Sequence, residues 1–147
     1  MSEHASVTIT QQTGYQFLID FGVGIPQLLA DEPVPMGAGE GPTPNHLLLA
    51  GVANCLSASL FFALQKFKQD PGGIQTTATA KIERNAEKRL RIEAIEVSIR
   101  LGKNSTDIEN LERVLSQFES FCTVSQSVQQ GIPISIAVQD GQGKRVK

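Results

Sequence analysis

The sequence predicts an α+β domain, in which strands and helices occupy separate stretches of a 147-residue chain. Three observations support this prediction. Apolar and polar residues alternate with the period of a strand in the first third and again after residue 74, whereas residues 41–65 contain no Asp, Glu, Lys or Arg and fit one long helix. A chain of this length builds one core, so we expect a single domain over residues 1–147.

The first third predicts three strands. Residues 7–10 and 17–21 alternate apolar with polar side chains, and the turn between them falls at 12–14. A short third strand is expected at 28–30. Residues 36–44 hold three glycines and two prolines, which is typical of an exposed loop.

A long helix follows this loop. Thr43 is a good N-cap, and Pro44 suits the first helical position, where no amide hydrogen is needed. The apolar run continues to Phe67, a length of about 35 Å at 1.5 Å per residue. The sequence Asp-Pro-Gly-Gly at 70–73 is expected to end the helix.

The uncharged run is long enough to consider a membrane span. It also holds Gly51, Asn54, Ser57 and Ser59, and it lies among amphipathic elements that need a core. We therefore expect a buried central helix and no membrane partner.

The second half predicts a hairpin, two short helices and a last strand. The hairpin strands are expected at 74–84 and 92–101, with a solvated, charged turn at 85–91. Thr106 and Glu109 have the spacing of a capping box, before a helical face of apolar residues: Ile108, Leu111, Leu115 and Phe118.

A second short helix is expected from Cys122 to Gln130, with Gly131 ending it. Residues 132–138 alternate apolar and polar side chains again, and they predict the closing strand.

The net charge and the N-terminal residues indicate which partners and which cellular location to expect. The formal net charge is -2, and the basic residues form no stripe, which argues against nucleic acid. The first residues lack the basic start and apolar run of a signal peptide, so we expect a cytoplasmic protein.

The two cysteines, Cys55 and Cys122, are the candidate chemical groups. In a reducing compartment a lone pair of cysteines can be catalytic, redox-sensing or simply buried. Cys122 opens a helix, whose free amides favour a thiolate, while Phe121 and Val124 give it an apolar setting that opposes ionisation. No cysteine or histidine pair has zinc-ligand spacing, so no metal or cofactor is expected.

Two motifs around these cysteines resemble the OsmC/Ohr family of osmotically inducible and organic-hydroperoxide-resistance proteins. The stretch Gly41–Cys55, GPTPNHLLLAGVANC, is similar to the family's motif at the start of its long helix, and Cys122-Thr-Val-Ser is similar to its Cys-Pro-Val-Ser. The resemblance implies an OsmC-like fold: a long central helix with Cys55 and a second helix with Cys122, packed against antiparallel sheets. It also implies an intertwined homodimer.

The resemblance further implies a thiol-dependent peroxidase in oxidative-stress defence. The residue matching Cys55 attacks organic or hydrogen peroxide and becomes a sulfenic acid. The residue matching Cys122 then forms a disulfide with it, and an external dithiol, lipoylated or of the thioredoxin type, reduces that disulfide.

The sequence departs from this pattern at two supporting positions. Family peroxidases usually carry a Glu ten residues before the reactive cysteine, where this chain has Asn45, and they recruit an Arg from the N-terminal strands, whereas no Arg precedes Arg84. Glu40, Asn45 and His46 are the candidate substitutes. One lost charge-assisted hydrogen bond, about 1.5 to 3 kcal/mol, slows a reaction roughly ten- to hundredfold.

Two other functions therefore stay open beside the peroxidase. The chain could be a non-peroxidase OsmC-like protein that binds a small apolar ligand or senses electrophiles at the dimer interface. It could also be a structural dimer whose buried thiols are inert.

Overall fold

The computed structural model describes residues 2–147 and divides into two compact units. The first unit contains the described residues up to Asn54 together with Ile74–Arg100, and the second contains Cys55–Gly73 together with Leu101–Lys147. The long helix belongs to both. The prediction of one domain over residues 1–147 stays a prediction.

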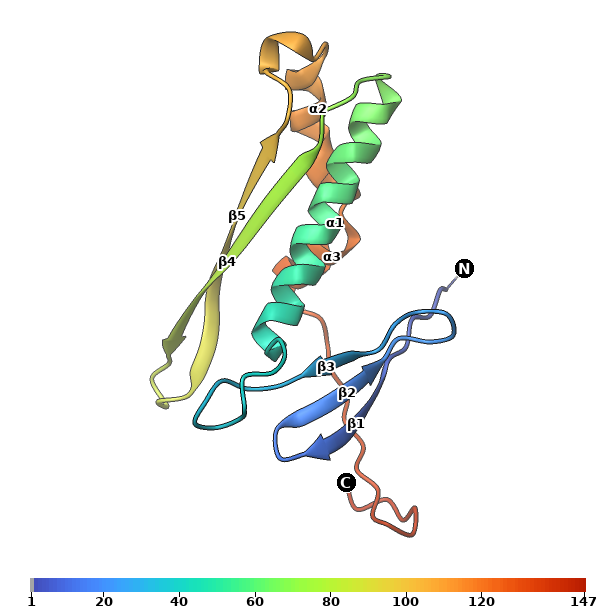
Figure 1. Cartoon of the computed structure of the whole chain (residues 1–147), viewed down its shortest axis with the longest axis vertical. Helices are drawn as coiled ribbons and strands as arrows, with labels where there is room; N and C mark the ends of the chain where they lie inside the picture. The colour runs from blue at the N-terminus through green and yellow to red at the C-terminus, as the bar shows by residue number, and fades with distance from the viewer. Residues whose placement is uncertain (1) are drawn as a thin grey trace. The chain divides into compact units, whose positions relative to one another are not determined.

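The element order confirms an α+β fold (Figure 1). The strands are β1 (Thr8–Thr13), β2 (Gln16–Asp20), β3 (Leu28–Ala30), β4 (Ile74–Arg84) and β5 (Leu90–Leu101). The α-helices are α1 (Pro44–Lys66), α2 (Leu111–Gln117) and α3 (Thr123–Gln130), and the 3-10 helices are η1 (Ser105–Asp107) and η2 (Phe118–Phe121).

In the first unit, β1, β2 and β3 form an antiparallel sheet in that order (Figure 1). Ile19 pairs with Ile9 on one side and with Leu28 on the other, and its side chain is only 3% exposed. The β1–β2 turn needs Gly14, which has a φ of +52°. All three predicted strands are confirmed, and for β1 and β2 the signal was the local alternation of apolar and polar residues.

The loop after β3 is organised by one buried carboxylate, that of Asp31, which is 1% exposed. The carboxylate accepts hydrogen bonds from the backbone N–H groups of Glu32 (2.7 Å), Ala38 (3.2 Å) and Glu40 (3.0 Å) and from Gln16 Nε2 (3.2 Å). The N–H of Glu40 contributes most to a pKa of Asp31 below its usual value. A Cβ at Gly37 would lie 2.3 Å from Asp31 Oδ1, so only glycine fits there.

Helix α1 begins as predicted, with a reciprocal cap at its first turn. Thr43 Oγ1 accepts the N–H of His46 at 3.3 Å, and His46 Nδ1 accepts the N–H of Thr43 at 3.1 Å. His46 thus occupies the position that Glu or Gln takes in a capping box. Pro44 is the first helical residue, where its missing amide hydrogen has no effect.

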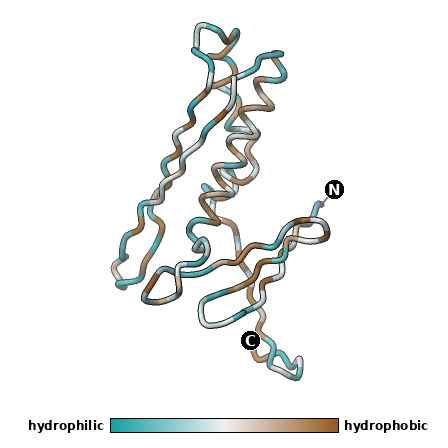
Figure 2. The backbone as a smooth tube through the Cα atoms, viewed as in Figure 1, coloured by the Kyte–Doolittle hydropathy of each residue, from teal (hydrophilic) through white to brown (hydrophobic). Residues whose placement is uncertain are grey.

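The prediction that α1 is buried holds on one face only. It is the described helix with the length and apolar composition of a membrane span, and 33% of its most apolar window is buried. Figure 2 shows hydrophobic colours along much of the helix. The exposed stripe contains Ala50, Gly51, Asn54, Ala58, Phe61, Phe62 and Gln65.

The opposite face of α1 builds the core of the second unit. Its last three turns bury a row of apolar side chains at helical spacing. These are Leu56, Leu60, Ala63 and Leu64, and Ile108 and Val114 are buried in the same unit.

Helix α1 ends earlier than predicted, at Lys66 rather than at residues 70–73. Lys68 adopts a left-handed conformation with a φ of +55°. Its N–H donates to the carbonyl of Gln65 at 2.9 Å, and the N–H of Gln69 donates to that of Leu64 at 3.0 Å. This is a Schellman motif, and a lysine rather than a glycine supplies its left-handed residue.

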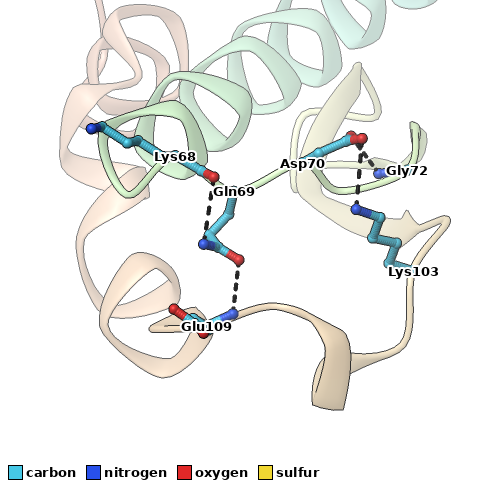
Figure 3. Close-up of polar contacts among 6 residues, drawn as sticks. All are labelled: Lys68, Gln69, Asp70, Gly72, Lys103 and Glu109. Carbon is cyan, nitrogen blue, oxygen red and sulfur yellow. Dashed lines mark hydrogen bonds and ion pairs between the residues drawn. The ribbon is translucent and has the colours of Figure 1, made fainter.

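A polar cluster ties the end of α1 to the chain before α2 (Figure 3). Gln69 Oε1 accepts the N–H of Glu109 at 2.9 Å. Asp70 accepts the N–H of Gly72 at 2.8 Å and forms an ion pair with Lys103 Nζ at 3.6 Å. The N–H of Gly72 is the main cause of a lowered pKa of Asp70.

The capping box predicted at Thr106 and Glu109 is wrong. Helix α2 begins at Leu111, after Asn110 in the left-handed conformation, and no side chain caps it. The N–H of Glu109 is instead taken by Gln69, a long-range partner that local spacing cannot reveal.

The β4–β5 hairpin is confirmed, with β5 starting two residues earlier than expected, at Leu90. Its turn is held by Asn85 Oδ1, which accepts the N–H groups of Glu87 and Arg89, each at 3.0 Å. Lys88 takes the left-handed conformation that the turn requires.

The predicted closing strand at residues 132–138 is not formed. Among residues 2–147 no strand is formed here or pairs with the segment, although the backbone of Val138 exchanges hydrogen bonds with Val146 and Lys147. Its apolar side chains are exposed, with Ile134 at 82% and Ile136 at 64%. The alternation is real, but a strand also needs a neighbour to accept its hydrogen bonds.

We predict that Asp31→Asn destabilises the protein near neutral pH, because the amide replaces a charged acceptor of several N–H groups. The lowered pKa of Asp31 means that the charge stabilises the fold above the ordinary value of 3.8 and stops doing so as the pH falls through the folded value. Urea unfolding midpoints should therefore separate the two proteins at pH 7 and converge in acid. Asp20→Asn is the control, since exposed Asp20 accepts one N–H; an equal loss in both variants would contradict the prediction.

Candidate active site

The structure brings the two predicted site cysteines together in the second unit. Cys55 lies on α1 and is partly buried, and Cys122 lies just before α3 and is 0% exposed. The two thiols are close enough for each to shift the pKa of the other. Both are free thiols.

Cys122 is the N-cap of α3. Its backbone is extended, with φ and ψ of -84° and 100°, and its Sγ accepts the N–H of Ser125 at 3.4 Å. A Ser, Thr, Asp or Asn oxygen usually accepts this hydrogen bond. The prediction that Cys122 stands at a helix N-terminus is confirmed, with the first helical residue one position later.

The same helix N-terminus also serves Cys55. The N–H groups of Val124 and Thr123, in the first turn of α3, favour the Cys55 thiolate and counter the rise in its pKa. Three successive amides that open a helix therefore act on the two sulfurs, and the N–H of Ser125 donates to that of Cys122. They form an anion-stabilising site that the sulfurs share.

The shared site shifts the pKa values of the two thiols in opposite directions. Burial raises the pKa of the Cys55 thiol, and its hydrogen bond to Cys122 raises it further, against the opposing effect of the two amides. Burial also opposes ionisation of Cys122, but the hydroxyl of Ser125, the thiol of Cys55, the N–H of Ser125 and the hydroxyl of Ser59 all favour its thiolate, and together they outweigh burial and lower the pKa of Cys122. Of the two thiols, Cys122 is therefore the more acidic.

Ser59 and Ser125 are site residues that the sequence reasoning missed in this role. Ser59 lies one turn after Cys55 on α1, is 7% exposed, and lowers the pKa of Cys122. Ser125 is 6% exposed, and its Oγ lies beside Cys122 without a hydrogen bond of good geometry to any described residue. The i, i+4 spacing of Cys55 and Ser59 was the available signal.

An aromatic and cationic cluster lies on the same face of α1, farther along. Lys66 Nζ is 4.9 Å from the ring centroid of Phe62 and 4.6 Å from that of Phe121. The two rings meet edge to face, with centroids 5.7 Å apart. Phe62 and Lys66 follow Cys55 by seven and eleven residues, which returns each to nearly the same side of the helix.

The three predicted supporting residues lie in the first unit, where Glu40 and His46 have structural partners. Glu40 Oε2 accepts a hydrogen bond from Gln16 Nε2 at 2.9 Å, and His46 belongs to the cap of α1. Asn45 is an exposed residue of the first helical turn. A supporting catalytic role for Glu40, Asn45 and His46 stays a prediction.

This arrangement suits reversible disulfide chemistry. One thiol is partly exposed to reactants, and a second, more acidic thiol lies against it within the same unit. A low thiol pKa provides the thiolate that attacks an oxidised sulfur.

The chain is similar to known proteins in sequence pattern and in fold. The family model described as OsmC-like protein matches residues 37–137, which include both cysteines and most of the chain. A comparison with curated proteins finds no match.

Three solved structures illustrate the fold similarity. An OsmC like protein from Mycoplasma pneumoniae is 15% identical, with a TM-score of 0.71 over 90% of this chain and 91% of that chain. An organic hydroperoxide resistance protein from Elizabethkingia anophelis is 19% identical, with a TM-score of 0.67 over 90% and 94%. An organic hydroperoxide resistance protein OsmC from Legionella pneumophila is 15% identical, with a TM-score of 0.67 over 87% and 92%.

We predict that Ser125→Ala raises the pKa of Cys122, because the substitution removes a hydroxyl that favours the thiolate. Thiolate absorbance at 240 nm against pH, in a Cys55→Ser background with one remaining thiol, measures this change. The unfolding free energy should change by less than about 1 kcal/mol, since the hydroxyl makes no hydrogen bond of good geometry. An unchanged titration would contradict the role given to Ser125.

Proposed function

Because the chain belongs to the OsmC family, we propose that it is a thiol-dependent peroxidase acting in peroxide and oxidative-stress defence. Cys55 is the nucleophile and Cys122 is the resolving thiol. The substrate is an organic hydroperoxide or hydrogen peroxide. The reaction needs no cofactor besides an external dithiol, lipoylated or of the thioredoxin type.

The observation that supports this function most directly is the meeting of both thiols at the N-terminus of α3. Two buried cysteines of purely structural use need no shared set of free amides. Here three N–H groups and two serine hydroxyls surround the sulfurs, and each favours an anionic sulfur or oxygen.

The reaction proceeds in two steps. The Cys55 thiolate attacks one peroxide oxygen, the O–O bond breaks, and the departing alkoxide takes a proton to become an alcohol. Cys55 is then a sulfenic acid. The Cys122 thiolate attacks its sulfur, the S–O bond breaks, and the hydroxide leaves as water after taking a proton.

Exposure and acidity favour different thiols as the first nucleophile. Cys122 has the lower pKa but is 0% exposed, whereas Cys55 has a raised pKa and is partly exposed. Access is decisive, because a thiolate that peroxide cannot reach does not react, while a thiol of raised pKa still supplies a small thiolate fraction. Cys55 therefore attacks first, and slowly at neutral pH.

The amides of Thr123 and Val124 supply part of what an arginine provides in family peroxidases. They point at the Cys55 sulfur and stabilise charge as it forms there. Neutral amides are weaker partners than a guanidinium, in keeping with a slow enzyme rather than an inactive one.

A second candidate function has one observation in its favour. The raised pKa of Cys55 slows its attack on peroxides, which suits a protein that binds a small apolar ligand at the dimer interface without turnover. Sensing of electrophiles, the other form of this function, needs a thiolate and gains nothing from the raised pKa. The peroxide experiment below separates this function from a peroxidase.

We also propose that the protein is a cytoplasmic homodimer. The exposed stripe of α1 and the segment 132–138 together leave many large apolar side chains in water. A second copy of the chain would cover them and could supply the strand neighbour that the segment lacks.

We predict that the purified protein consumes cumene hydroperoxide when a dithiol is supplied, and that Cys55→Ser abolishes the activity. Because the pKa of Cys55 is raised, the rate of the first turnover should increase roughly tenfold for each pH unit above neutrality until that pKa is reached. Stopped-flow measurement of peroxide loss tests both statements.

The matched control is Cys122→Ser. It should complete one turnover and leave a sulfenic acid on Cys55 that dimedone traps. Equal peroxide consumption by wild type and Cys55→Ser would overturn the assignment, and no consumption by either would favour the ligand-binding function.

For the dimer, we predict a sedimentation mass twice the 15.9 kDa of one chain. Ile134→Asp should weaken association roughly ten- to hundredfold, the effect of losing one buried isoleucine worth about 1.5 to 3 kcal/mol. Val23→Asp is the control, since Val23 is fully exposed on a turn outside the apolar segments. A monomeric mass at micromolar concentration would rule the dimer out.

A further inference from the structure

The two sulfurs of the proposed disulfide would differ in how a reducing thiol can reach them. Cys122 is 0% exposed, and its sulfur is held inward by the N–H of Ser125 at 3.4 Å. Cys55 is partly exposed on α1, and the exposed stripe of that helix passes beside it at Asn54 and Ala58.

The two sulfurs also differ as leaving groups when the disulfide is attacked. When a thiolate attacks one sulfur of a disulfide, the other departs as a thiolate, and the sulfur with the better-stabilised anion departs faster. Around Cys122 the N-terminus of α3, the hydroxyl of Ser59 and that of Ser125 all favour the anion. Access and leaving ability therefore select the same direction of attack.

We propose that the external thiol attacks the Cys55 sulfur of the disulfide and that Cys122 leaves as a thiolate into the N-terminus of α3. This inference rests on the proposed function, since it concerns the reduction of the disulfide formed there. It assigns Cys55 two roles: its thiolate attacks the peroxide, and its sulfur later forms the mixed disulfide with the reductant. Cys122 is never bonded to the reductant.

The electrons balance in two exchanges. The first reductant thiolate forms a bond with the Cys55 sulfur, the Cys55–Cys122 bond breaks, and its electron pair stays on Cys122. The second thiol of the reductant, as a thiolate, then attacks the reductant's first sulfur, which is bonded to Cys55 in the mixed disulfide. Cys55 leaves with that electron pair and takes a proton, while the dithiol has become a disulfide.

Ser125 is a positioning residue in this step. Its N–H caps the Cys122 sulfur, and its buried Oγ has no hydrogen bond of good geometry among residues 2–147, which leaves that hydroxyl ready to turn toward a full thiolate. Ser59 contributes the second hydroxyl from α1. Both act on the leaving sulfur, and neither touches the reductant.

The test begins with protein oxidised by diamide, so that the disulfide forms without peroxide. A monothiol, 2-mercaptoethanol, is added for short times, the reaction is quenched in acid, free thiols are alkylated, and peptides are mapped by mass spectrometry. The expected early product carries 2-mercaptoethanol on Cys55 and an alkyl group on Cys122, in at least roughly tenfold excess over the reverse product.

Three outcomes would overturn the proposal: adducts mainly on Cys122, equal amounts on both cysteines, or no intramolecular disulfide after diamide. None of these depends on peroxidase activity. A protein that forms the Cys55 adduct but consumes no peroxide would support the inference and refute the proposed function. A protein that consumes peroxide but forms the adduct mainly on Cys122 would support the proposed function and refute the inference.

A variant series tests the positioning role. Ser125→Ala should slow the appearance of the Cys55 adduct roughly two- to tenfold, the effect of one lost hydrogen bond on a leaving group. Ser125→Thr, which keeps a hydroxyl, should restore most of the rate, and Ser127→Ala on the same helix should leave it unchanged. Equal rates for Ser125→Ala and Ser127→Ala would remove Ser125 from the mechanism, while the adduct position tests the direction of attack independently.

Discussion

The chemistry of this protein depends on one constraint: two sulfurs share the N-terminus of a single short helix. Helix α3 is eight residues long and offers its first amides to Cys122 through Ser125 and to Cys55 through Thr123 and Val124. One set of partial positive charges stabilises one negative charge well, and two adjacent thiolates would repel each other. The pKa of one thiol is therefore lowered while that of the other is raised. This division of charge follows from the geometry and needs no charged side chain.

The site also requires that α1 keep a fixed register against α3 within the second unit. The buried row Leu56, Leu60 and Leu64 holds α1 in the core of the second unit through apolar packing. The Schellman motif at Lys68 ends the helix at a defined residue, and the polar cluster of Gln69 and Asp70 fixes its end to the chain before α2. A thiol pair must stay within bonding reach in both redox states, and rigid helix ends provide that precision more reliably than a loop.

The sequence predicted what depends on neighbours along the chain. The three N-terminal strands, the start of α1 at Thr43 and Pro44, and Gly131 after α3 were all correct, because alternation, caps and left-handed glycines are local signals. What depends on distant partners was missed or wrong. The N–H of Glu109 bonds to Gln69 rather than to Thr106, and the segment 132–138 has strand alternation without a strand to pair with. Both cysteines were found through their motifs, whereas Ser59 and Ser125 were missed in their role because only the packing of α1 against α3 gives them one.

The missing arginine and glutamate have a physical consequence beyond a slower rate. A guanidinium beside Cys55 would hold the thiolate there and would compete with Cys122 for the role of anion. Without it, the buried thiol is the more acidic of the pair and the partly exposed thiol is the less acidic. A raised pKa of Cys55 lowers its thiolate fraction and so slows its oxidation, because thiolates rather than thiols react with peroxides and disulfides. The same arrangement keeps Cys122 a ready nucleophile once Cys55 has been oxidised, so the second step gains from the feature that slows the first. In such a protein, peroxide attack by Cys55 is the slow step, and disulfide formation by Cys122 follows it quickly.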